Sequence, residues 1–143
     1  MEKTLDIRYL RDITHLTQTS KGDWVDLRAG EDVDLKKGEV AIIPLGFAMK
    51  LPEGYEALVA PRSSTIKKYG IMVGNSIGII DESYSGNTDE WGLVAYAIRD
   101  THIDMNDRIC QFRIIEHQPT LKFNEVDKLD GPNRGGFGST GHK

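Results

Sequence analysis

The sequence has little cysteine and no long apolar run. Its single cysteine, Cys110, excludes a disulfide within the chain, and so low a cysteine content fits a reducing compartment. No apolar run approaches the roughly 20 residues that a membrane-spanning helix needs. Residues 1–6 are mainly polar, unlike the apolar stretch of a secretory signal peptide. We therefore expect a cytoplasmic protein with no membrane partner.

An excess of positive charge is also missing, because the formal net charge is −4 at pH 7. Proteins that bind DNA or RNA through the backbone phosphates ordinarily carry a basic face, so we expect no polymeric nucleic acid as a partner. A small anion such as a nucleotide stays compatible, since a few local cations can dominate the field at one site. The 143 residues suit a single domain that buries a core without disulfides.

Helix signals are few along the chain. Most of it consists of short apolar runs between turn residues, a pattern typical of strands. The clearest runs are residues 39–44, 55–60, 93–98 and 109–115. In the last of these, an apolar face alternates with a face that carries Gln111 and Arg113. Short strands at this spacing predict an all-β sandwich or barrel.

Two local signals interrupt the strand pattern. Residues 63–65 all carry hydroxyl groups and can cap a short helix that Gly70 would end. Between two short apolar runs in residues 71–77, the pair Gly74-Asn75 is typical of a tight turn. We therefore expect one short helix, followed by a hairpin.

The C-terminal segment differs in composition from the rest. Residues 131–143 hold five of the 15 glycines and a single large apolar residue, Phe137. Glycine amides can approach phosphate oxygens closely, and Arg134 adds a bidentate donor, although this composition is also typical of a disordered tail. We divide the chain into a body, residues 1–133, and a glycine-rich closing arm, residues 134–143.

Four further residues carry chemistry but are ambiguous one at a time. Arg62 precedes three hydroxyl residues and fits an anion site, although a simple helix cap explains the same run. Asp81 follows an apolar run and can orient and deprotonate a water, whereas most turn aspartates bond their own backbone. Tyr84 fits either a platform for a base or sugar or a core aromatic. A lone strand glutamine such as Gln111 is more often surface than site.

Histidine and cysteine do not indicate a metal centre. The spacing of zinc ligands is not found among the four histidines: His15, His102, His117 and His142. Cys110 has no histidine close in sequence, so we expect it in the core.

Taken in order, these segments resemble the five motifs of the trimeric dUTPase family. The resemblance rests on residues 24–29, 61–64, 74–86, 107–112 and 134–141, which span nearly the whole chain. Each motif alone is weak, whereas five in this order are specific. Two departures are present: Ser64 replaces the usual glycine of the second motif, and the fifth motif is two residues shorter than usual. The family resemblance assigns no role to residues 87–91.

The resemblance implies hydrolysis of dUTP to dUMP and pyrophosphate, which limits uracil incorporation into DNA and supplies dUMP for thymidylate synthesis. Asp81 would hold the water that attacks the α-phosphorus, with Asp26 and Arg62 as the other catalytic residues. Mg²⁺ would be held by phosphate oxygens and waters rather than by side chains. Asp26 would steady one of those waters or Arg62.

The same resemblance implies how the substrate is held. Backbone groups around Gly78 and Ile80, with Asn75 nearby, would read uracil, and Tyr84 would pack under the deoxyribose. The remaining substrate-binding residues would surround the phosphates: Ser63, Ser64, Gln111, Arg134, Phe137, Gly138, Ser139 and Thr140. The implied fold is a jelly-roll-like β-barrel with one short helix. Three chains would form a homotrimer, and each flexible arm would close over a neighbour's site.

Two alternatives stay open at this point. The chain also resembles dCTP deaminase, an enzyme of the same fold that carries Arg-Ser-Ser. That family uses a glutamate in the strand after the Asp…Gly turn, whereas residues 92–98 hold no acid here and Glu90 lies before them. The second alternative is a regulatory binding protein built on the dUTPase fold.

Overall fold

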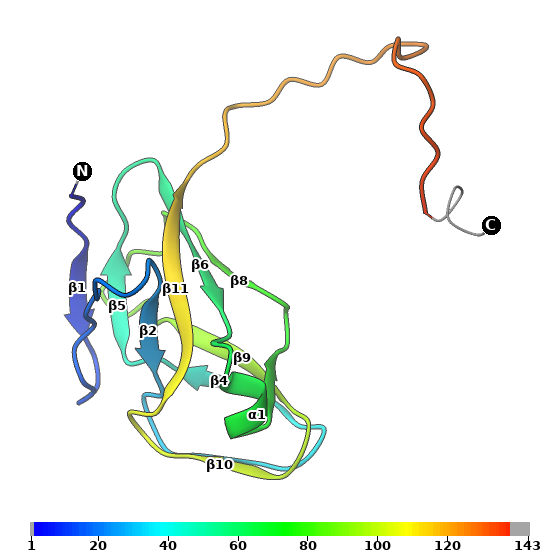
Figure 1. Ribbon diagram of the computed structural model, residues 1–143. Helices are drawn as coiled ribbons and strands as arrows, with labels where there is room; N and C mark the ends of the chain where they lie inside the picture. Colours follow the sequence, from blue (N-terminus) through cyan, green and yellow to red (C-terminus); the bar gives the residue numbers. More distant parts are fainter. Residues whose placement is uncertain (1, 138–143) are drawn as a thin grey trace.

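The computed structural model describes residues 2–137, which form short strands and one short helix (Figure 1). The strands are β1 (Asp6–Tyr9), β2 (Val25–Arg28), β3 (Val33–Leu35), β4 (Val40–Pro44), β5 (Phe47–Lys50), β6 (Tyr55–Ala60), β7 (Ile71–Val73), β8 (Gly78–Ile80), β9 (Gly92–Ala97), β10 (Thr101–Ile103) and β11 (Arg108–Glu116). The helix α1 covers Thr65–Tyr69. The predicted all-β class with one short helix is confirmed. No helix in residues 2–137 has the length and apolar character to cross a membrane.

The strands form two larger sheets and two ribbons, all antiparallel. One sheet has the order β2-β11-β6-β8 and the other the order β4-β9-β7, while β1 pairs with β5 and β3 with β10. β11 is the longest strand and runs through the middle of the body (Figure 1). Both larger sheets contribute to one core, for example through Val59 and Leu93. The predicted strand runs 39–44, 55–60, 93–98 and 109–115 correspond to β4, β6, β9 and β11.

An aromatic group lies at the centre of this core. Trp91 is 0% exposed, and its ring lies 5.0 Å from that of Phe47 and 5.3 Å from that of Phe112, measured between centroids. Offset and edge-on contacts of this kind add to the burial of a large apolar area. Cys110 is also fully buried, as predicted, and burial raises the pKa of its thiol. It is therefore a core residue with no reactive thiolate.

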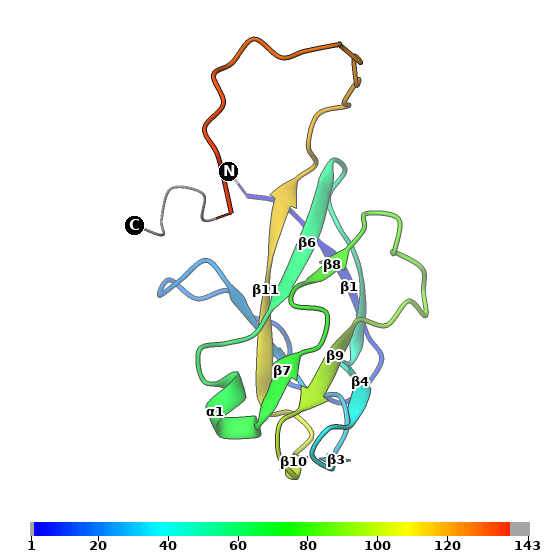
Figure 2. The ribbon, with the colours of Figure 1, turned by 90° about the vertical axis from the view of Figure 1, so that its right-hand side faces the viewer.

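The prediction of a hydrogen-bonded hairpin in residues 71–77 was wrong. β7 pairs with β9, and β8 pairs with β6 in the other sheet. The intervening turn contains Ser76 in the left-handed region, with φ 67°. Strands of three residues form few bonds with each other, whereas β6 and β9 each offer six residues. β7 and β8 therefore separate, and each keeps one edge without a strand partner, where Figure 2 shows them one above the other.

Residues 87–91, for which the sequence suggested no role, fasten the N-terminal segment to the body. The Glu90 carboxylate accepts hydrogen bonds from Arg11 through Nε at 2.7 Å and Nη2 at 3.2 Å, and from the Gly46 amide at 3.0 Å. Arg8 donates from Nη1 to the carbonyl of Asn87 at 2.7 Å. The hydrogen bond to Glu90, and then the negative charges of Glu90 and Glu31, raise the pKa of Arg11. Glu90 is therefore a structural anchor.

Beyond β11 the chain leaves the body as an extended segment (Figures 1 and 2). The His117 amide still donates to the Gly54 carbonyl at 2.9 Å, and residues 118–137 then contain no helix or strand. Every residue of this extension is exposed. Phe123 is 90% exposed and Leu129 84%. Apolar side chains at such exposure have almost nothing to pack against within residues 2–137.

Candidate active site

The end of β6 brings together four polar side chains from three parts of the sequence. Gln111 on β11 stands opposite Asp26 on one side and opposite Ala60 on the other. Arg62 Nε lies 3.0 Å from Asp26 Oδ1, and Arg108 Nη1 lies 3.5 Å from Asp26 Oδ2. Gln111 Nε2 donates to the carbonyl of Pro61 at 3.1 Å. We call Asp26, Arg62, Arg108 and Gln111 the arginine cluster.

The arginine cluster has the charge of an anion site. Two guanidinium groups share the single carboxylate of Asp26, so one positive charge stays unpaired within the cluster. Arg62 is the more buried of the two arginines, and its Nη1 also donates to the Arg108 carbonyl at 3.3 Å. Planar guanidinium groups bind phosphate oxygens in pairs of hydrogen bonds. The arrangement is suited to several phosphate oxygens at once.

The turn after β6 leads from Arg62 directly into α1. Ser64, one of the three hydroxyl residues expected to cap the helix, stands at the N-cap of α1, but its side chain makes no capping bond. Thr65 supplies the hydroxyl that this turn uses: its Oγ1 accepts from the Arg62 amide at 2.8 Å. Gly70 ends the helix with φ 63°, as predicted.

A second group of side chains lies just beyond β8. Asp81 Oδ2 accepts hydrogen bonds from the Ser83 amide at 2.9 Å and from the Ser83 hydroxyl. These two bonds, the hydroxyl first, lower the pKa of Asp81, and the charge of His117 acts in the same direction. The carboxylate is therefore ionised at neutral pH. Its other oxygen, Oδ1, has no hydrogen-bond partner within residues 2–137.

Tyr84 is held in the same turn. Its amide donates to the Asp81 carbonyl at 3.0 Å, and its hydroxyl donates to the Glu90 carbonyl at 2.9 Å. The ring stays exposed. Because both ends of the residue are hydrogen-bonded, the ring has a fixed place beside Asp81 and can serve as a flat surface for a ligand.

The two groups stand at opposite ends of β6 within one chain. The pairing of Ala57 with Ile80 places Asp81 level with Glu56, whereas Arg62 lies two residues beyond Ala60, the last residue of the strand. Gln111 of the cluster is level with Ala60, so four residues of strand separate it from the level of Asp81, which amounts to roughly 13 Å. A single chain therefore does not bring Asp81 and the arginine cluster to one point.

The other predicted site residues lie in three places. Asn75 is exposed in the turn after β7, and Gly78 and Ile80 begin and end β8. A Cβ added at Gly78 would lie 3.1 Å from Cβ of Val59, which leaves little room for a side chain there. The exposed extension carries Arg134 and Phe137 away from both groups. Gly138, Ser139 and Thr140 lie outside the described residues.

Comparison with known proteins identifies the chain. The sequence pattern of the dUTPase family matches residues 11–141. The chain belongs to the dUTPase family. The SPbeta prophage-derived deoxyuridine 5'-triphosphate nucleotidohydrolase YosS of Bacillus subtilis (strain 168) is 54% identical over 140 residues, covering 97% of this chain and 99% of that protein. The deoxyuridine 5'-triphosphate nucleotidohydrolase of Finegoldia magna is 39% identical, covering 82% and 84% of the two chains.

Solved structures of dUTPases share this fold. A mutant of Staphylococcus bacteriophage 80alpha dUTPase, solved with dUpNHpp, aligns with a TM-score of 0.79 at 21% identity, covering 98% of this chain and 99% of that one. A mutant dUTPase of phage phi11 of S. aureus, whose structure reveals the coordination of a structural Mg(II) ion, aligns with a TM-score of 0.76 at 21% identity, covering 89% and 99%. At this identity the likeness establishes the fold.

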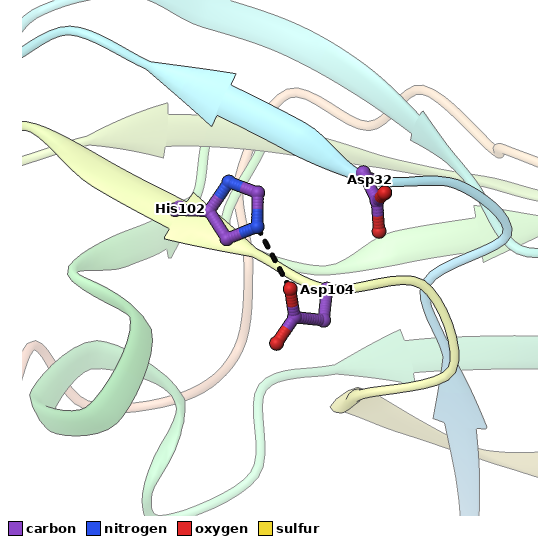
Figure 3. Close-up of side chains that lie close together, drawn as sticks. All are labelled: Asp32, His102 and Asp104. Atoms are coloured by element: carbon purple, nitrogen blue, oxygen red, sulfur yellow. Dashed lines mark hydrogen bonds and ion pairs between the residues drawn. The ribbon is translucent and has the colours of Figure 1, made fainter.

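This member of the dUTPase family also contains a group that sequence reasoning missed. His102 Nδ1 lies 2.7 Å from Asp34 Oδ1, and His102 Nε2 lies 2.8 Å from Asp104 Oδ1. Asp32 is close by, with its own Oδ1 bound by the Met105 amide at 2.7 Å (Figure 3). The signal in the sequence was weak, because His102 and Asp34 are 68 residues apart.

The histidine group fastens two strands rather than filling a cleft. His102 on β10 stands directly opposite Asp34 on β3, so a protonated ring joins the strands by an ion pair. The hydrogen bonds to Asp34 and then to Asp104 raise the pKa of His102. All of these side chains are exposed to solvent, and solvent screens such pairs. We therefore expect a small, pH-dependent contribution to stability.

The substitution His102→Gln is expected to lower the melting temperature at pH 6 and to change it little at pH 9. A raised pKa in the folded state means that the contribution is fully present below about pH 6.5, the unfolded value. It is lost as the pH rises through the folded pKa. Melting curves of both proteins across this range give the measurement. Asp34→Asn should show the same pH dependence, and a melting difference that is equal at pH 6 and pH 9 would contradict the ion-pair account.

Proposed function

We propose that this chain hydrolyses dUTP to dUMP and pyrophosphate, with Asp81 holding the water that attacks the α-phosphorus. The observation that carries the proposal is the ionised carboxylate of Asp81, exposed at the end of β8 beside the fixed ring of Tyr84. The names of the Bacillus subtilis and Finegoldia magna relatives support the same reaction. Asp81 acts mainly by orienting water, because its lowered pKa makes it a weak base.

Uracil is read at the separated edges of β7 and β8. Each of these strands has an edge without a strand partner, and backbone amides and carbonyls on such an edge match the polar edge of a pyrimidine. Gly78 and Ile80 border this space, with Asn75 in the turn. We propose that this space is too narrow for the methyl group of thymine. Tyr84 packs under the deoxyribose and excludes a 2′-hydroxyl.

The arginine cluster binds the phosphates. Arg62 and Gln111 contribute donors from the end of β6 and from β11, and Ser63 and Ser64 add exposed or half-exposed hydroxyls in the turn between them. Asp26 holds Arg62 in place through the 3.0 Å ion pair. The positive charge of the cluster stabilises the charge that develops on the phosphate oxygens during attack.

Mg²⁺ is the cofactor that this donor set suits. Asp26 is the only carboxylate of the arginine cluster, and both of its oxygens already face arginines, so the cluster has no protein cage for a cation. Mg²⁺ keeps most of its waters and binds substrate phosphates, which needs no such cage. When bound, it would neutralise phosphate charge, and Asp26 would steady one of its waters.

A homotrimer accounts for the distance between the two groups. Asp81 and the arginine cluster stand at opposite ends of β6 in one chain, so a complete site requires a neighbouring copy. The sheet β4-β9-β7 supports this assembly, because one of its faces exposes Val40 to 63% and Ile42 to 71%, with Met72 and Tyr96 beside them. An apolar face of this kind is typical of an interface.

The C-terminal arm, residues 134–143, closes over a neighbour's site. The extension after β11 leaves the body with its apolar side chains exposed, which supports a docking place on another copy. The arm contains the proposed substrate-binding residues Arg134, Phe137, Gly138, Ser139 and Thr140. We place the protein in the cytoplasm, where dUTP hydrolysis limits uracil incorporation into DNA and supplies dUMP for thymidylate synthesis.

The deaminase alternative is not favoured by the position of Glu90. Deamination needs a free glutamate beside the base, but the Glu90 carboxylate is bonded to Arg11 and the Gly46 amide. No acid lies in β9 to replace it. The regulatory alternative lacks an observation in its favour.

Hydrolysis is expected to be far faster with dUTP than with dTTP, dCTP or UTP. Steric exclusion of a methyl or hydroxyl group, combined with unpaired backbone donors when the wrong base is present, discriminates by orders of magnitude. Pyrophosphate release from each nucleotide measures this, and a chelator should abolish the release until Mg²⁺ is restored. Equal turnover of dCTP and dUTP would overturn the assignment.

Replacing Asp81 by Asn should lower kcat by about 100-fold or more while dUTP still binds, because the amide keeps the shape but loses the charge that holds the water. The fold should be little affected, since the side chain is exposed. Single-turnover rates and dUTP titration give the two values. Asp89→Asn in the same turn region serves as a control. A purified Asp81→Asn protein with wild-type kcat would show that another group positions the water.

Mixed trimers test whether each site is shared between copies. Asp81→Asn and Arg62→Gln are each expected to be inactive alone. Random one-to-one assembly should restore about a quarter of the sites if Asp81 and Arg62 come from different copies, and none if they come from one. A chain that ends at Asn133, used in place of Arg62→Gln, tests the arm in the same way. Mixed trimers confirmed by mass but inactive would refute sharing.

A further inference from the structure

Thr65 differs from every other polar residue of the structure. Among residues 2–137 it is the only polar or charged residue that is buried, at 0% exposure. Its Oγ1 accepts a hydrogen bond from the Arg62 amide at 2.8 Å and donates one to the Ile109 carbonyl at 3.0 Å. A hydroxyl buried in this way is satisfied on both sides, and both partners are backbone groups.

These two bonds connect the halves of the arginine cluster. Arg62 lies in the turn after β6, and Ile109 lies on β11 between Arg108 and Cys110. The two other links between this turn and β11 are the bond from Gln111 Nε2 to the Pro61 carbonyl and the bond from Arg62 Nη1 to the Arg108 carbonyl, and both are exposed to solvent. Water competes less with the bonds of Thr65, because the bond to the Ile109 carbonyl is buried and the bond from the Arg62 amide is partly buried.

We propose that Thr65 is a positioning residue for dUTP hydrolysis. It fixes the distance between the turn that carries Arg62 and Ser63 and the residues Arg108 and Gln111 on β11. The inference rests on the proposed role of the arginine cluster in binding phosphates. Donors from the turn and from β11 must reach the same group of phosphate oxygens. A shift of about 1 Å between two such sets costs on the order of 100-fold in rate.

Threonine suits this position through both parts of its side chain. The hydroxyl makes the two hydrogen bonds, and the methyl group fills space in the packed contact between α1 and β11. Valine has nearly the same shape but removes the hydrogen-bond partner that Thr65 gives to the Arg62 amide and to the Ile109 carbonyl. Serine keeps both bonds and lacks only the methyl group. Comparing valine with serine at residue 65 therefore separates the effect of the hydrogen bonds from the effect of packing.

The experiment compares Thr65→Val with Thr65→Ser, with Ile43→Val as a control for a lost methyl group in the core of the other sheet. For each protein, kcat and KM are measured with dUTP, and binding of inorganic pyrophosphate and of dUMP is titrated. Thr65→Val is expected to lower kcat/KM about ten-fold or more and to weaken pyrophosphate binding. Binding of dUMP should change less than three-fold, because dUMP lacks two of the three phosphates that the arginine cluster is proposed to bind.

Thr65→Ser should restore kcat/KM to within about three-fold of wild type, whereas Ile43→Val should lower the melting temperature without affecting catalysis. If Thr65→Val lowers only the melting temperature and leaves kcat/KM and pyrophosphate binding unchanged, Thr65 is structural and the proposal fails. If Thr65→Val does not fold, Thr65→Ala is measured below its own melting temperature against the same criteria. If the wild-type protein binds pyrophosphate but does not hydrolyse dUTP, the proposed reaction is refuted. The pyrophosphate titrations would then still test whether Thr65 positions the arginine cluster.

Discussion

The ladder that β6 forms with β11 on one side and β8 on the other decides where Arg62, Gln111 and Asp81 stand. Six residue pairs fix β6 against β11, and three fix it against β8. The first pairing sets Gln111 beside the turn of Arg62, and the second sets Asp81 level with Glu56. A shift of one residue in either register would turn these side chains to the opposite face. The core around Trp91 keeps that register, because it buries one face of the strands from both sheets.

Extended geometry is also the physical basis of the proposed trimer. A strand of six residues cannot bring its two ends together, so a chain with phosphate ligands at one end and the attacking group at the other cannot complete a site alone. A closed ring of three copies would place the arginine cluster of one copy beside Asp81 of the next. The exposed apolar face with Val40 and Ile42 and the bare extension after β11 are consistent with contacts that form only in that assembly.

The sequence predicted the strands well and their partners poorly. An apolar run such as residues 55–60 indicates a buried strand from local sequence alone. The strands β4, β6, β9 and β11 were therefore predicted. The Gly74-Asn75 pair indicates a turn between two consecutive strands, but it does not determine which strands pair. The longer strands β6 and β9 pair with β8 and β7, so the predicted hairpin was wrong. Glu90 and His102 were missed because their partners, Arg11 and Asp34, are 79 and 68 residues away. Asp26 was named only through the family motifs, and Arg62 and Gln111 were ambiguous until those motifs were considered.

The electrostatics of the two groups differ in a way that suits their separate tasks. Ser83 stabilises the charged form of Asp81, so the carboxylate gains orientation and loses basicity. Asp26 lies between Arg62 and Arg108 and holds both guanidinium groups without cancelling their combined charge. Proton transfer to Asp81 is weakly favoured, so the rate must come from placing the water and the phosphates correctly. That demand makes a rigid turn at Arg62 more valuable than a stronger base at Asp81.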